Sequence, residues 1–71
     1  MTDKQERQFY NELYDYFGNE EIILNRVLVD ALVDRNNIIG LPKLLKRWEK
    51  EGKCQIIKDS AYQIEAIVLI N

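Results

Sequence analysis

The chain has 71 residues, with ten basic and twelve acidic side chains, one cysteine and no histidine. A chain of this length has room for one domain, which buries only about 60% of the surface of its unfolded form. A single cysteine forms no internal disulfide, and the lack of histidine excludes zinc enzymes and Ser-His or Cys-His catalysis. We therefore expect a single, non-enzymatic domain that holds no metal and no cofactor.

The first residues and the apolar runs of the chain predict the cellular compartment of the protein. Residues 1–7 are polar and lack the apolar core of a secretory signal. The apolar runs are only a few residues long, whereas a membrane span needs about 20 residues. We expect a cytoplasmic protein with no membrane association.

The net charge of −2 hides an uneven distribution along the chain. Residues 1–40 hold four basic and eight acidic side chains, whereas residues 41–58 hold six basic and two acidic ones. Screening limits the reach of a charge to about 8 Å at physiological salt, so a local excess matters more than the total. The basic segment is therefore a candidate surface for a polyanion, and the alternative is an ordinary solvated helix face.

The first predicted helix covers residues 3–17. Thr2 and Gln5 have the spacing of a capping box, and Gly18 can end the helix. Apolar side chains recur at helical spacing and predict a buried stripe: Phe9, Leu13, Tyr16 and Phe17. Tyr10 and Tyr14 widen this stripe, so an aromatic face that binds a partner remains the alternative.

The second predicted helix covers residues 20–35, with Asn19 as its cap. Its only polar strip consists of Arg26, Asp30 and Asp34, so we expect the helix to be central in the fold or partly buried in a dimer interface. Its many β-branched residues leave a strand over residues 26–33 as the alternative. Ile38 and Ile39 are candidates for a short strand.

The third predicted helix covers residues 41–51. Gly40 opens it, Pro42 fits its first turn, and Gly52 ends it. At 100° per residue its side chains form two opposite stripes. The apolar stripe is Leu41, Leu44, Leu45 and Trp48, and the basic stripe is Lys43, Lys46, Arg47 and Lys50.

The remaining residues, 53–70, predict a β-hairpin with strands at 54–58 and 61–70 and a turn at Asp59-Ser60. Alternate residues of the second strand form one apolar face: Tyr62, Ile64, Ala66, Val68 and Ile70. Cys54 is interpreted as a small packing residue, with a reactive thiol as the alternative. The predicted fold class is α+β, with three helices followed by a C-terminal β-hairpin.

This order of elements, together with the segment LPKLLKRWEKEGK at residues 41–53, resembles winged-helix DNA-binding domains over about residues 20–70. In that superfamily a recognition helix leads into a two-stranded wing. The resemblance implies recognition-helix contacts to double-stranded DNA from Lys43, Lys46, Arg47 and Lys50, and a wing contact from Lys58. Lys53, which carries the same charge at the start of the hairpin, is added as a candidate backbone contact.

The basic stripe contains no Asn, Gln, Ser or Thr, the residues that commonly contact base edges beside arginine. Its lysines favour binding to phosphates over discrimination between sequences. Arg47 is the one outward side chain of the stripe that can make a bidentate contact to guanine.

Two hypotheses for function follow from these patterns. The first is a small DNA-binding regulator of transcription or replication from a phage or mobile element. The second is an interaction module that binds a larger protein, or self-associates through its aromatic and apolar helices. The two are compatible, because a homodimer formed through the first two helices would present two recognition helices to two DNA half-sites.

Overall fold

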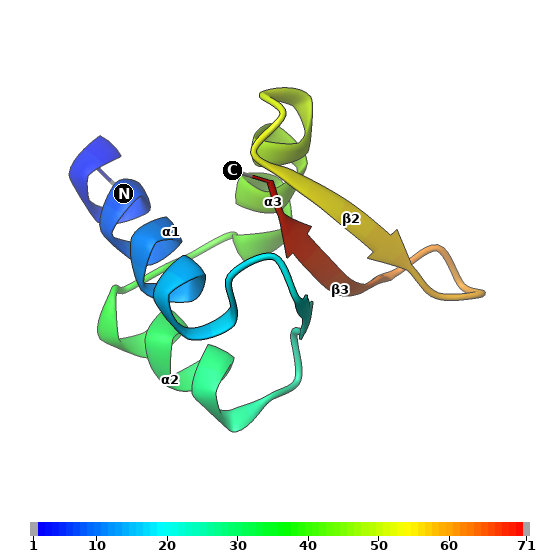
Figure 1. Ribbon diagram of the computed structural model, residues 1–71, viewed down its shortest axis with the longest axis horizontal. Helices are drawn as coiled ribbons and strands as arrows, with labels where there is room; N and C mark the ends of the chain where they lie inside the picture. The colour runs from blue at the N-terminus through cyan, green and yellow to red at the C-terminus, as the bar shows by residue number, and fades with distance from the viewer. Residues whose placement is uncertain (1, 71) are drawn as a thin grey trace.

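The computed structural model describes residues 2–70. It contains three helices and three strands in the order α1 (Asp3–Phe17), β1 (Glu21–Ile23), α2 (Val27–Arg35), α3 (Leu41–Lys50), β2 (Cys54–Lys58) and β3 (Ile64–Leu69) (Figure 1). The predicted α+β class, with three helices and a C-terminal hairpin, is confirmed. One strand that was not predicted, β1, adds to the hairpin and completes a three-stranded antiparallel sheet of order β1-β3-β2.

Helix α1 begins and ends where the sequence predicts. The Thr2 hydroxyl accepts a hydrogen bond from the backbone N–H of Gln5, and the Gln5 side chain accepts one from the backbone N–H of Thr2 at 3.0 Å. Phe9 and Leu13 are buried in the core. Tyr16 is 60% exposed, so the buried stripe is narrower than predicted and leaves this ring in solvent.

The prediction of one helix over residues 20–35 is wrong for residues 20–26, because α2 begins only at Val27. Residues 21–23 form β1, in which Ile22 is fully buried and lies opposite Ile67 of β3. Pairing with a strand from the other end of the chain satisfies these backbone groups, and it suits β-branched residues better than a helix does. Asn19 therefore caps no helix, and its side-chain amide donates to the Leu69 carbonyl at 2.8 Å. The alternative strand at residues 26–33 is also wrong, because α2 covers most of it.

The connection from α2 to α3 is a tight turn that contains no strand. Asn37 has a positive φ of 54°, and the amides of Asn37 and Ile38 donate back to the last turn of α2, as in a Schellman motif. Ile38 is buried by this turn and Ile39 is left exposed. Gly40 and Pro42 then open α3 as predicted, with a left-handed φ of 76° at the glycine.

The inner face of the sheet is set by the register of its strands. Residues that lie opposite one another share a face, so Ile22, Ile67 and Ile56 point together toward the helices. A register shift after Ile57 places an extra residue in β3. As a result Ile64 packs against the core, as do Ile67 and Leu69, and the single apolar face predicted for alternate residues of this strand is wrong.

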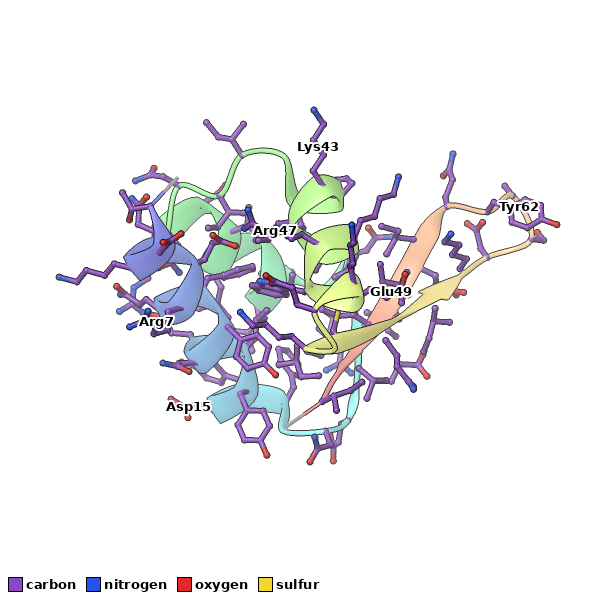
Figure 2. The ribbon with its side chains drawn as sticks, turned by 90° about the horizontal axis from the view of Figure 1, so that it is seen from above. Arg7, Asp15, Lys43, Arg47, Glu49 and Tyr62 are labelled. Atoms are coloured by element: carbon purple, nitrogen blue, oxygen red, sulfur yellow. The ribbon has the colours of Figure 1, made fainter. Side chains whose placement is uncertain are left out.

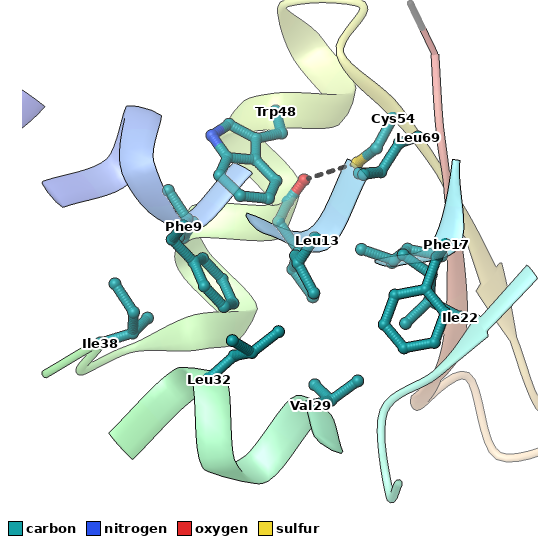
Figure 3. Packing of buried hydrophobic residues seen from close by; sticks show 13 residues of the cluster. Phe9, Leu13, Phe17, Ile22, Val29, Leu32, Ile38, Trp48, Cys54 and Leu69 are labelled. Atoms are coloured by element: carbon teal, nitrogen blue, oxygen red, sulfur yellow. Dashed lines mark hydrogen bonds between the residues drawn. The ribbon is translucent and has the colours of Figure 1, made fainter. Parts of the chain in front are cut away.

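Trp48 joins the helices to the sheet. Its ring lies 5.9 Å from that of Phe9 and 5.2 Å from that of Tyr10, the second contact being edge-to-face (Figure 3 shows Trp48 and Phe9 in the core). The Tyr10 hydroxyl lies 2.8 Å from the Ile70 carbonyl oxygen and 3.1 Å from that of Lys53. Helix α1 is thereby tied to the base of the hairpin as well as to α3.

Strand β2 lies at an edge of the sheet, with α3 beside it. The Glu49 carboxylate accepts a hydrogen bond from the backbone N–H of Ile56 at 3.3 Å. A side chain of α3 thus satisfies a donor on the free edge of the strand.

Cys54 is 2% exposed, and its thiol lies 3.7 Å from the carbonyl oxygen of Leu45 (Figure 3). This burial confirms the interpretation of Cys54 as a packing residue. Burial, and secondarily the negative charge of Glu49, raise the pKa of the Cys54 thiol from 9.0 to about 11.

In the part of the chain that the structure describes, no helix is long and apolar enough to cross a membrane.

Replacing Tyr10 by phenylalanine keeps the ring contact with Trp48 and removes the hydroxyl. We expect the free energy of unfolding to fall by about 1 kcal/mol, the usual contribution of such a hydrogen bond, in urea unfolding. The matched control is Tyr16→Phe, which alters an exposed ring and should leave stability unchanged. Equal effects from the two substitutions would contradict the role of the Tyr10 hydroxyl.

The raised pKa of Cys54 predicts a loss of stability at high pH. The folded protein keeps the thiol protonated to a higher pH than the unfolded chain does, so this stabilising contribution is complete below pH 9 and is lost as the pH rises through about 11. Urea unfolding over this interval should show a steeper decline for the wild type than for Cys54→Ala. Parallel declines would show that the thiol makes no such contribution.

Candidate nucleic-acid interface

Helix α3 separates its apolar and basic residues onto opposite sides. Leu44, Leu45 and Trp48 are buried against α1 and the sheet. All four residues of the predicted basic stripe are exposed: Lys43, Lys46, Arg47 and Lys50. The stripe therefore lies on the outer surface of the molecule, where a large ligand has access to it.

Arg47 differs from the lysines of the stripe because it is ion-paired. Its guanidinium contacts the Glu6 carboxylate of α1, and Figure 2 shows Arg47 on the α3 surface that faces that helix. The Arg47 side chain is half exposed and that of Glu6 is largely buried. The pairing was missed from the sequence because it joins two distant helices that only the tertiary fold brings together.

Lys53 and Lys58 lie at opposite ends of β2. Lys53 forms a 3.6 Å ion pair with Glu51, with both side chains about half exposed, a type of contact that contributes little to stability. Among residues 2–70, no ion pair involves Lys43, Lys46, Lys50 or Lys58. These four lysines can therefore bind an incoming anion without breaking an ion pair of that part of the chain.

The tip of the hairpin is longer than the two-residue turn that was predicted at Asp59-Ser60. The Asp59 carboxylate accepts hydrogen bonds from the backbone amides of Ala61 and Gln63 at 2.8 and 3.0 Å. Tyr62 lies in this loop with a positive φ of 60° and is 85% exposed. Figure 2 shows it at the end of the hairpin, far from α1. The prediction of Tyr62 on a strand is wrong, because β3 begins only at Ile64 and leaves Tyr62 in the loop.

Two hollows adjoin α3. The larger, of about 600 Å³, lies between α1 and α3 and is lined by as many acidic as basic residues: Asp3, Glu6 and Glu51 with Arg7, Arg47 and Lys53. Its balanced charge makes it a poor site for a polyanion. The smaller, of about 150 Å³, lies at the first turn of α3 and is lined by Ile39, Gly40, Lys43, Leu44 and Arg47.

No cluster of three or more Cys, Asp or Glu residues that could hold a metal ion occurs within residues 2–70. Comparisons with protein-family models, with curated protein sequences and with solved structures each find no match. The features that bear on function are therefore those of the chain itself, above all the basic side of α3.

Proposed function

We propose that the protein binds double-stranded DNA, with α3 in the major groove and the hairpin against the neighbouring backbone. The observation that carries this proposal is the set of exposed lysines on α3 that form no ion pair within residues 2–70. Lys43 and Lys50 are two turns apart, about 10 Å along the helix axis. A helix of this kind fits the major groove, and its lysines can reach phosphates on either side.

The order of three helices followed by a hairpin supports the same proposal, because it is the arrangement that the resemblance to winged-helix domains implies. The uneven distribution of charge favours the approach of DNA from the side of α3. Acidic residues predominate in α1 and α2, whereas the outward residues of α3 are mostly basic. A polyanion is attracted to α3 and repelled by the acidic residues of α1 and α2.

The proposed contacts favour affinity over sequence discrimination. Lysines bind phosphates as point charges and carry little information about the bases. Arg47 would have to leave or share Glu6 to contact guanine. We propose that the protein is a regulator of transcription or replication that binds DNA in a strongly salt-dependent manner.

The Lys46→Gln variant tests the proposal. In fluorescence anisotropy with a random-sequence duplex, we expect the slope of log K against log salt to become shallower by about 0.9, because one phosphate contact is lost. The matched control is Lys4→Gln, which removes an exposed lysine from α1 and should leave the slope unchanged. Equal slopes for all three proteins, or no binding by the wild type at low salt, would contradict the proposal.

A second candidate function, self-association, is favoured by the exposed apolar residues around the β1–α2 turn. Ile23, Val27 and Leu28 all present large apolar side chains to solvent, with Val27 84% exposed. In Figure 1 this turn lies at the end of the molecule away from α3. A second copy is the partner that we propose, since a dimer joined there would leave both α3 helices free to occupy two half-sites.

Val27→Glu tests self-association, because the new carboxylates would repel each other and resist burial in a two-fold interface. We expect the wild type to dimerise with increasing concentration in sedimentation equilibrium, and the variant to remain monomeric. Tyr16→Glu, a change at an exposed residue outside the turn, should dimerise like the wild type. A wild type that is monomeric at every concentration would contradict this second candidate.

A further inference from the structure

Ile39 is a large apolar residue that the fold leaves in solvent. It is 87% exposed, whereas its neighbour Ile38 is buried in the core. The turn after α2 thus directs one isoleucine inward and the next outward. The side chain of Ile39 lines the small hollow at the first turn of α3, beside Lys43.

The small hollow combines apolar walls with cations. Ile39 and the buried Leu44 line it with apolar side chains, and Gly40 has no side chain. Lys43 and Arg47 also line the hollow. A volume of about 150 Å³ accommodates a small apolar group attached to an anionic polymer.

Thymine presents such a group, because its C5-methyl is an apolar group on a base edge in the major groove. The first residues of a groove-bound helix are those that approach base edges most closely. We propose that the thymine methyl group contacts Ile39 in this hollow, and that Ile39 is a specificity-determining residue. This inference rests on the proposed DNA binding by α3.

The site would supply the base discrimination that the lysines lack. Lys43 on the same turn would bind the adjacent phosphate and hold the base edge over Ile39. The free protein keeps Ile39 in water, so its apolar surface would be buried only when the DNA places a methyl group against it. A·T-containing sites would therefore be favoured at the position that faces this turn.

Two duplexes that differ only in the methyl group test the inference. One is an alternating A-T duplex, and the other is the same duplex with deoxyuridine in place of every thymidine. Fluorescence anisotropy should show roughly fourfold tighter binding of the thymine duplex by the wild type, the ratio that burial of one methyl group corresponds to. Ile39→Ala should bind both duplexes equally, while retaining the fold, because the replaced side chain is exposed.

The matched control is Ile70→Ala, which shortens another exposed isoleucine outside the hollow and should keep the preference for thymine. Equal binding of both duplexes by the wild type would overturn the methyl contact and leave the proposed DNA binding intact. Retention of the preference by Ile39→Ala would overturn the assignment to Ile39. Failure of the wild type to bind either duplex at low salt would overturn the inference and the proposed function together.

Discussion

The packing of Trp48 against α1 is the contact on which the rest of the structure depends. Its ring contacts two consecutive aromatic residues, Phe9 and Tyr10, and it comes from the same side of α3 as Leu44 and Leu45. This anchoring fixes the rotation of α3 about its own axis. Because the apolar side faces the core, Lys43, Lys46 and Lys50 on the opposite side of the helix point to solvent. The exposure of the basic stripe is thus a consequence of core packing.

The acidic residues around α3 also contribute to the exposure of its positive charge. Glu6 draws Arg47 toward α1, Glu51 pairs with Lys53, and Glu49 is directed to the sheet edge. Glu6, Glu49 and Glu51 are therefore each occupied by a specific internal contact. Lys43, Lys46 and Lys50 lie on the side of α3 that we propose meets DNA, and no carboxylate within residues 2–70 forms an ion pair with them.

Sequence patterns predicted correctly the features that depend on interactions between residues close together in the chain. The capping residue Thr2, the turn at Gly40-Pro42 and the two stripes of α3 all act within a few residues, and the structure has them as expected. Strand β1 was missed because Ile22 gains its strand partner only when β3, near the end of the chain, folds beside it. The Arg47–Glu6 pair was missed for the same reason, since it depends on how two distant helices pack. The exposure of Ile39 was missed because the tight turn at Asn37 replaces the short strand that was expected there. Tyr62 was wrongly predicted on a strand, because the Asp59 carboxylate organises a loop that is longer than the two-residue turn expected at Asp59-Ser60.

The hydrogen bond from Ile56 to Glu49 also bears on how the protein behaves at high concentration. An edge strand with free amides is a template onto which a strand of another molecule can add. Of the two edge strands, β2 would pair more readily with a strand of another molecule. It has five residues and contains the apolar pair Ile56-Ile57, whereas β1 has only three residues. Since the carboxylate already occupies the Ile56 amide, an incoming strand would lose one of its backbone bonds and meet a negative charge. The Glu49 side chain therefore makes the addition of a strand from another molecule to β2 less favourable.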